Sequence, residues 1–281
     1  MRTFPAKGSA VAKRVASNPA LEFLERLGYA TRGVLYGVMG LLALRIALNL
    51  GGGQATDLSG SLVFLIANPF GKVVLVAMIA GLAAYSVWGF VRAILDPLHR
   101  GRDASGVMAR VGFASSALSY AAISFFALQI LMGASAAPGD STQKTAASLL
   151  SHPFGGWLTI VIGIVAIGVG IGQFLAAYQA PFARDLKSAE MTDKERSAVV
   201  GLGRFGMAAR GVSFLVIGWF LIQAGVHSDP SQAQGFGGTF LFLLNEPFGH
   251  VLVGVVAAGF VALGLHSLGC ARWIRLMGSS T

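Results

Sequence analysis

The tripeptide Pro-Phe-Gly occurs three times along the chain, as Pro69-Phe70-Gly71, Pro153-Phe154-Gly155 and Pro247-Phe248-Gly249. Each copy follows, by 43 residues, an arginine that begins the pattern Arg-x-Gly. These leading arginines are Arg26, Arg110 and Arg204. Two landmarks that keep one spacing in three places define an internal repeat, so the chain is predicted to fold as three copies of one structural unit.

The composition is that of an integral membrane protein. Of 281 residues, 54% are hydrophobic and 12% are charged, with a mean hydropathy of +0.69. Ordinary soluble domains carry roughly 25% charged residues. The net charge of +9 comes from basic residues between apolar segments, which indicates membrane orientation rather than nucleic-acid binding. The single cysteine, Cys270, excludes an intramolecular disulfide and any Cys-x-x-Cys motif.

Six apolar segments have about the 20 residues that a helix needs to cross a bilayer, two in each repeat. The sequence therefore predicts an all-α membrane protein whose six transmembrane helices form three parallel two-helix repeats with a pseudo-threefold arrangement. The predicted spans are 31–50, 72–94, 113–133, 156–178, 207–227 and 251–273. The predicted repeats are 26–100, 110–184 and 204–278, with a cytoplasmic linker at 185–203.

The tail, residues 1–25, is predicted to be cytoplasmic and to carry a helix that starts at Asn18-Pro19. This helix lies in the membrane interface or folds onto the cytoplasmic loops. Short apolar pieces before each tripeptide, at 61–68, 146–152 and 239–246, are too short to span. We expect them to form short helices in the outer interface or dipping into the bundle.

Lysines and arginines fix the expected orientation. Eighteen of the 21 lie in the tail, in the two inter-repeat linkers and at the C-terminal end, whereas the opposite side has only Lys72 and Lys144. The positive-inside rule places both termini in the cytoplasm and the three Pro-Phe-Gly loops outside. The expected partner is the lipid bilayer itself, with anionic lipids at the cytoplasmic face.

The start of each repeat carries a further pattern. Residues 26–33 read RLGYATRG and residues 204–211 read RFGMAARG. Together with the tripeptides, these stretches resemble the bacterial membrane family known as domain of unknown function 1206. The resemblance implies a six-helix protein of three repeats in the bacterial inner (plasma) membrane, with no agreed activity. The second repeat has Ser116 and Ala117 where the others have arginine and glycine, so that arginine has no strictly threefold role.

Three polar residues coincide nineteen positions after the leading arginines: Arg45, Gln129 and Gln223. Arginine at mid-helix costs about 2.5–3.5 kcal/mol on insertion scales, and such groups usually face the bundle interior or a water-filled cavity. One hypothesis is a polar ring around the threefold axis. The alternative is that Arg45 reaches the outer headgroups and that the two glutamines form hydrogen bonds across helix contacts.

Two further sets are candidate sites. Arg32 and Arg210 lie nearer the cytoplasmic boundary, where they either extend to anionic headgroups or capture a lipid headgroup or anion. On the outer side, each tripeptide proline follows a polar residue: Asn68, His152 and Glu246. These residues are candidates for a proton or metal site, although three unlike residues make a poor ligand set. No metal or other cofactor is expected.

Aromatic residues occupy the opposite side of the first spans. Tyr36, Tyr120 and Phe214 coincide in the three repeats, half a turn around the helix from the Arg45 position. This aromatic face is expected to pack on the second spans. The two histidines of the last span, His250 and His266, are expected to be hydrogen-bonded packing residues.

Two classes of function remain, and the chain is not expected to be an enzyme, because it carries no His-Glu-x-x-His, Gly-x-Ser-x-Gly or phosphate-loop motif. The first is a conduit or carrier for a small polar or anionic solute. The second is a non-transporting scaffold whose basic linkers bind lipid or a protein partner. In the last linker, Thr192 and Glu195 form a predicted capping box for a charged helix that is solvated or docks a partner.

Overall fold

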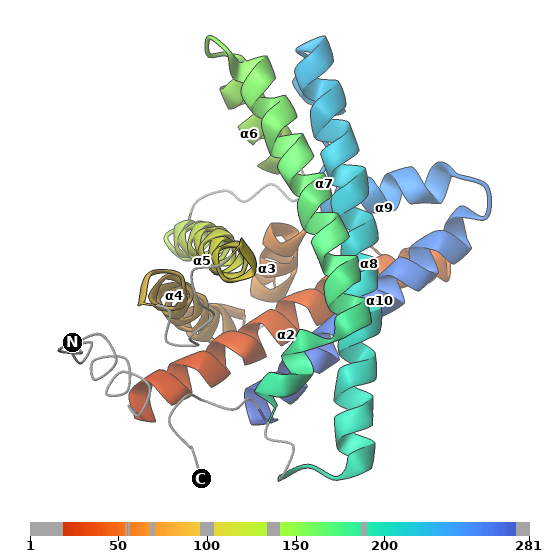
Figure 1. Cartoon of the computed structure of the whole chain (residues 1–281). Coiled ribbons are helices and arrows are strands. Elements are labelled where there is room, and N and C mark those ends of the chain that lie inside the picture. The colour runs from red at the N-terminus through yellow and green to blue at the C-terminus, as the bar shows by residue number, and fades with distance from the viewer. Residues whose placement is uncertain are drawn as a thin grey trace, which may run out of the picture.

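The computed structural model describes residues 19–53, 55, 57–67, 71–95, 104–133, 141–186 and 190–273, and its regular elements are helices (Figure 1). The six long helices are α2 (Pro19–Ala47), α4 (Gly71–Leu95), α5 (Ala104–Leu131), α7 (Gly155–Gln179), α8 (Asp193–His227) and α10 (Gly249–Trp273). The shorter elements are α3 (Leu58–Ile66), α6 (Ser141–Leu150), α9 (Phe236–Asn245) and the 3₁₀ helices η1 (Pro181–Asp185) and η3 (Pro230–Gln232).

All six predicted spans are confirmed as helices long and apolar enough to cross a membrane, within the described residues. Two of them extend further than expected. The predicted tail helix is continuous with the first span, because α2 runs unbroken from Pro19, while Asn18 lies outside the described residues. The predicted capping box at Thr192 and Glu195 is confirmed, and α8 continues from it without a break to His227.

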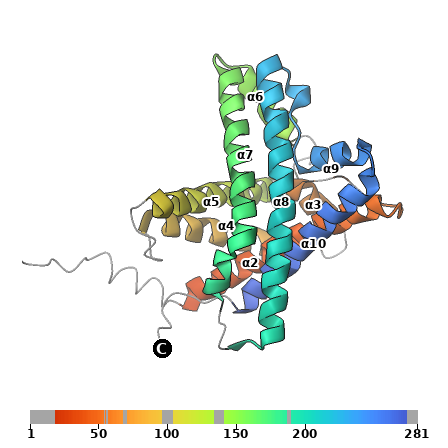
Figure 2. The same cartoon turned by 45° about the vertical axis from the view of Figure 1, so that its right-hand side comes forward.

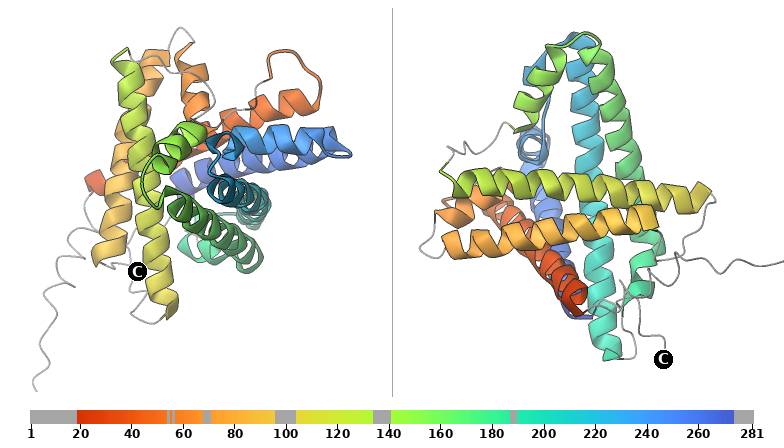
Figure 3. Two further views of the ribbon diagram at one scale, coloured as in Figure 1. Left: turned by 90° about the horizontal axis from the view of Figure 1, so that it is seen from above. Right: turned by 90° about the vertical axis from the view of Figure 1, so that its left-hand side faces the viewer.

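The long helices form three antiparallel pairs that join different repeats. The second span of each repeat packs on the first span of the next, so that α4 lies against α5, α7 against α8, and α10 returns to α2. The α7–α8 pair stands upright in Figures 1 and 2, and the other two pairs cross it. Figure 3 shows that each pair points in its own direction. This cyclic pairing is the pseudo-threefold arrangement of the three repeats.

Glycines set the closest of these pairings. In α7 and α8 they recur every seven residues and face one another across the pair. A Cβ atom on Gly163 would lie 2.8 Å from the carbonyl oxygen of Gly218, so the two backbones approach as closely as glycine allows. The facing pairs are Gly156–Gly225, Gly163–Gly218 and Gly170–Gly211.

The three pairings use equivalent positions of the repeat. Gly33 meets Gly264 in the α2–α10 pair, where a Cβ on Gly33 would lie 2.9 Å from the Gly264 carbonyl oxygen. These positions correspond by repeat spacing to Gly211 and Gly170. In the α4–α5 pair the same positions hold Ala117 and Ser86, and the Ser86 hydroxyl donates to the Ala117 carbonyl at 2.8 Å. The pair with the fewest glycines is held by a hydrogen bond instead.

The three helix pairs are not packed equally closely against one another. Within the first repeat α2 packs on α4, and within the third α8 packs on α10, but no comparable packing joins α5 to α7 among the described residues. Both α5 and α7 expose most of their apolar surface, as helices in contact with lipid do. The second repeat, which lacks the arginine of the other two, is therefore also the most loosely held.

The Pro-Phe-Gly motif is a tight corner between a short helix and the following span. Phe154 and Phe248 have the positive φ values of 65° and 61°, and their side chains are exposed. The next residue, Gly155 or Gly249, begins the span so close to the preceding short helix that a Cβ atom would overlap a backbone carbonyl. Glycine is therefore required at this position. In the first copy Gly71 behaves the same way, whereas Pro69 and Phe70 lie outside the described residues.

The short helices before these corners enter the bundle with one face. Leu62 of α3 and Phe240 of α9 are fully buried in the main hydrophobic core. In α6 the buried residue is the smaller Ala146, which packs near Ala224 and Ala233. One face of each short helix therefore contributes to the packing of the bundle.

Replacing Gly163 by alanine tests the glycine contacts of α7 and α8. The new methyl group would press on the Gly218 backbone, which cannot move away cheaply, so Gly163→Ala should destabilise the protein by about 1–3 kcal/mol. The measurement is thermal unfolding of the purified protein in detergent. Gly168→Ala, on the same helix, is the matched control, because its Cβ would meet nothing within 4 Å. Equal unfolding temperatures for the two variants would contradict this account of the packing.

Candidate functional site

Arg32 of α2 is half-buried, and its guanidinium lies among tyrosine rings. Its guanidinium carbon lies 5.3–5.9 Å from the centroids of four rings. These rings belong to Tyr29, Tyr36, Tyr85 and Tyr120. Guanidinium groups bind aromatic faces at such distances, and the attraction is stronger away from water. The structure thus places the Arg32 guanidinium among aromatic rings, and whether it also reaches lipid headgroups stays a prediction.

Arg210 of α8 reaches the same place from the third repeat. Its guanidinium carbon lies 5.5 Å from the Tyr36 ring and 5.2 Å from the Phe214 ring. Both arginines thus contact the ring of Tyr36, which also stacks on Phe260 of α10 at 5.9 Å. The predicted contact between the aromatic face and a second span is confirmed at Tyr36. We call the group formed by Arg32, Arg210, Tyr36, Tyr85 and Tyr120 the central cluster.

Hydroxyl groups give the central cluster a polar network. Nη1 of Arg32 donates to the Tyr85 hydroxyl at 2.7 Å. The hydroxyls of Tyr36 and Tyr120 lie 3.3 Å apart and form a hydrogen bond in which either is the donor. Tyr36 and Tyr120 come from equivalent positions of the first two repeats, so the first spans meet through these side chains near the pseudo-threefold axis.

The central cluster holds two positive charges and no negative one. The Nε atoms of Arg32 and Arg210 are buried and have no hydrogen-bond partner in the described part of the chain. No acidic residue occurs in 58–95, 104–139 or 196–228, which hold the apolar stretches of three of the six spans. A buried charge without a partner is costly, so the cluster is suited to a ligand that brings negative charge.

The predicted polar ring stays a prediction. Arg45 lies at the exposed end of α2, where its guanidinium donates to the carbonyl of Gly51. Gln129 and Gln223 are half-buried, and no hydrogen bond among the described residues joins any two of the three. Nine residues along a helix make about two and a half turns, so side chains at this level point to the opposite side from Tyr36 and Tyr120. The central cluster is the stronger candidate site.

The outer polar set is only partly described. Asn68 lies outside the described residues. His152 is exposed, and its Nδ1 lies 2.8 Å from the Ser148 carbonyl oxygen, while Glu246 is exposed at the C-terminal end of α9. The described residues contain no group of three or more histidines, cysteines, aspartates or glutamates able to hold a metal.

The two histidines of α10 have their hydrogen-bond partners outside the central cluster. Nδ1 of the buried His266 is 2.8 Å from the Val199 carbonyl oxygen, and its ring packs on Phe182 at 4.8 Å. Nε2 of the exposed His250 is 3.2 Å from Oδ1 of Asn49. Both histidines therefore have the hydrogen bonds expected of packing residues.

Two of the three leading arginines donate hydrogen bonds to the C-terminal end of a helix in the neighbouring repeat. Nε of Arg110 donates to the Ala93 carbonyl at 2.7 Å, and Nη2 donates to the Ile94 carbonyl at 3.1 Å, at the end of α4. Arg26 reaches the Arg272 carbonyl at the end of α10, although at 3.5 Å. Cations are favourable at these helix ends, where backbone carbonyls lack partners.

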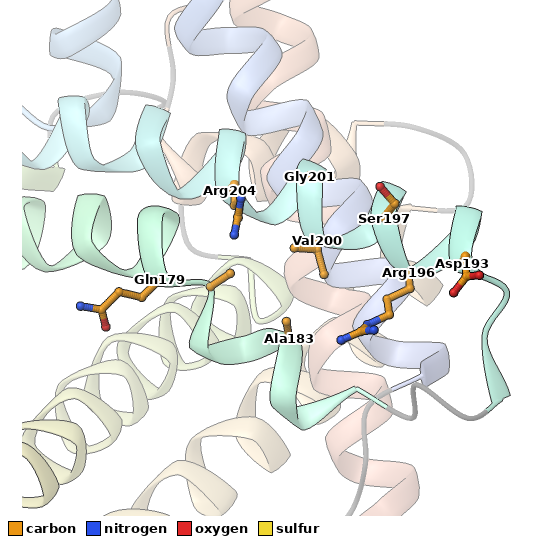
Figure 4. Close-up of a pocket in the computed structure, with 9 residues that line it drawn as sticks. Gln179, Ala183, Asp193, Arg196, Ser197, Val200, Gly201 and Arg204 are labelled. Atoms are coloured by element: carbon orange, nitrogen blue, oxygen red, sulfur yellow. The ribbon is translucent and has the colours of Figure 1, made fainter.

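The third leading arginine lines a hollow instead. Arg204 makes no comparable hydrogen bond to α7 among the described residues, and it borders a hollow of about 570 Å³ between α7, η1 and α8. Figure 4 shows Arg196 and Arg204 on the side of α8 that faces Ala183. Asp193, Ser197 and Gln179 also line this hollow. We call it the Arg196–Arg204 hollow.

Sequence reasoning missed Tyr85 and Tyr29. Tyr85 lies on the second span of the first repeat, where the other repeats have Val169 and Leu263, so an alignment of the repeats does not single it out. A signal was nevertheless present. A buried arginine needs acceptors or aromatic faces, and the chain has only five tyrosines to supply them.

Comparison with known proteins identifies the family. The sequence profile described as Domain of Unknown Function (DUF1206) matches three stretches, residues 27–96, 111–180 and 205–273. The chain belongs to this family. It is also similar to the uncharacterized protein YxxB of Bacillus subtilis (strain 168), with 32% identity over 252 residues and 90% of each chain covered. No solved structure matches. The three matches confirm the three repeats, and this DUF1206 chain is a multi-pass membrane protein whose family has no assigned function.

Removing one hydroxyl tests the network of the central cluster. Tyr85→Phe leaves Nη1 of Arg32 without its acceptor, which should lower the stability of the protein by about 1.5–3 kcal/mol, as for hydrogen bonds to charged groups. Thermal unfolding in detergent measures the loss. Tyr178→Phe is the control, because Tyr178 is 83% exposed. If both variants unfold at the wild-type temperature, Arg32 does not depend on Tyr85.

Proposed function

We propose that this DUF1206 protein is a conduit or carrier for a small anionic solute, and that the central cluster binds that solute. The observation that carries the proposal is the pair of half-buried arginines, Arg32 and Arg210, whose Nε atoms are buried and have no hydrogen-bond partner among the described residues. Charged groups inside membrane proteins usually mark ion or substrate pathways. The chain acts by binding rather than by catalysis in this proposal.

The position of the central cluster supports a transport function. Its residues come from all three repeats, through Tyr36, Tyr120 and Arg210, so a ligand there contacts every repeat at once. The backbones of α2, α5 and α8 pack less closely on each other than on their pair partners, and long side chains occupy the space between them. Side chains rearrange more easily than packed glycine helices, so solute passage need not separate the pairs.

Anion flux into liposomes tests this function. Protein reconstituted in liposomes should carry chloride or inorganic phosphate faster than protein-free liposomes do. Arg210→Met, which removes the charge and keeps an apolar stem, should reduce that flux roughly tenfold, because one charge-assisted hydrogen bond is worth about 1.5–3 kcal/mol. Arg45→Met is the matched control, since Arg45 is exposed and outside the central cluster.

Two results would overturn the proposal. Flux that is lost in Arg45→Met and kept in Arg210→Met would move the pathway to the polar ring of Arg45, Gln129 and Gln223. Flux of neither anion above the protein-free background would favour the second function, below.

The second candidate function is a non-transporting scaffold that binds anionic lipid or a protein partner. The Arg196–Arg204 hollow favours it, because Arg204 is not used there to cap α7 and Arg196 lies two turns earlier on the same helix. In that case Arg196→Gln and Arg204→Gln should reduce anionic phospholipid bound to the purified protein, while Arg210→Met should not.

The location and orientation of the chain are part of the same proposal. We place the protein in the bacterial inner membrane with both termini in the cytoplasm, on the distribution of basic residues. In a Cys270→Ser background, an impermeant thiol reagent added outside spheroplasts should label Ser231→Cys in η3 and leave Ser197→Cys in α8 unlabelled. Both native serines are exposed in the structure. The reverse labelling pattern would invert the topology.

A further inference from the structure

The central cluster has more hydrogen-bond donors than its own acceptors can satisfy. Nε of Arg32 and Nε of Arg210 are buried N–H donors without a described partner. The Tyr85 hydroxyl accepts from Arg32, so its own proton is not used in that bond. In the Tyr36–Tyr120 pair one hydroxyl donates to the other, which leaves one more proton. Two guanidinium groups and two hydroxyl protons of one cluster are therefore available to an added acceptor.

We infer that the central cluster recognises a phosphate group, either as free inorganic phosphate or as the headgroup of an anionic lipid. This inference rests on the proposed function and names the chemical class of its ligand. A phosphate group has several oxygen acceptors in a tetrahedral arrangement, and guanidinium groups bind such oxygens in pairs.

Charge and acceptor number separate phosphate from other anions. The cluster carries two positive charges and no described carboxylate, so a group that brings more than one negative charge balances it better than a monovalent ion. Chloride has no directional acceptors to satisfy hydroxyl and guanidinium donors. A carboxylate has two oxygens for donors that come from three repeats, so it leaves more of them unpaired.

The substitutions between repeats agree with a single, asymmetric ligand. Ser116 occupies the position of Arg32 and Arg210 in the second repeat, and Phe214 occupies the position of Tyr36 and Tyr120 in the third. Charge is thus supplied by the first and third repeats, and paired hydroxyls by the first and second. A ligand bound there would meet cationic donors from two repeats and hydroxyls from two repeats, but no set repeated three times.

Thermal unfolding of the purified protein in detergent tests the inference without any transport. Inorganic phosphate should raise the unfolding temperature in a saturable way, because a ligand that binds only the folded state stabilises it. Chloride and acetate at the same ionic strength should not. Short-chain phosphatidic acid, compared with short-chain phosphatidylcholine, distinguishes the lipid source from free phosphate. A shift with either phosphate source supports the inference.

Variants test whether the phosphate-induced stabilisation arises at the central cluster. Arg210→Met should abolish the shift and Arg45→Met should keep it. Tyr120→Phe, which removes one hydroxyl from the pair, should weaken phosphate binding at least several-fold and serves if Arg210→Met fails to fold. Equal shifts with chloride and phosphate, or a phosphate shift unchanged in both Arg210→Met and Tyr120→Phe, would overturn the inference.

The binding and flux measurements distinguish a failure of the phosphate inference from a failure of the proposed transport function. Phosphate binding without flux of any anion would remove the conduit and leave the phosphate site. Chloride flux that depends on Arg210, without a phosphate-induced shift, would leave the conduit and remove the phosphate site.

Discussion

The close approach of helix backbones at small residues is the constraint on which the rest of the structure depends. Within a membrane, helices gain little from burying apolar surface and associate through close packing and interhelical hydrogen bonds instead. Gly163 and Gly218 satisfy this requirement in one pair, and Gly33 and Gly264 in another. Because these contacts join the second span of one repeat to the first span of the next, they determine both the cyclic order of the helices and the rotation of each helix about its own axis.

That rotation decides which side chains meet at the centre. With the glycine faces of α2 and α8 turned to their partners, Tyr36 and Arg210 point to the space between the first spans. Backbones remain further apart there, and only long side chains fill the gap. An arginine–tyrosine network is a stable filling because each guanidinium contacts aromatic faces and Arg32 also donates to a hydroxyl, yet the network leaves the charge itself unbalanced. The close packing within each helix pair and the unbalanced charge at the centre thus both follow from how the helices are rotated about their axes.

The architecture was predictable from the sequence, whereas the centre was not. Repeat spacing, the length of the apolar runs and the Thr192 capping box each depend on local chemistry, which a sequence displays directly. A membrane helix is apolar on every side, however, so its pattern does not reveal which side faces a neighbour. The sequence therefore did not show that Arg32, rather than Arg45, lies among the tyrosines. Glycines that recur every seven residues in α7 and α8 carry the missing information, because they mark the contact face and thereby the opposite one.

The return of α10 to α2 ties the two ends of the chain together. Since α2 leaves the ribosome before α10, the glycine face around Gly33 and Gly40 lacks its native partner until α10 has been made. No single repeat is a self-sufficient folding unit, because its best contacts are made with its neighbours. Insertion of the six helices and their assembly must then be distinct events, with assembly completed only when the last helix arrives. Loss of the last few turns of the chain would accordingly disturb the first helix as much as the last.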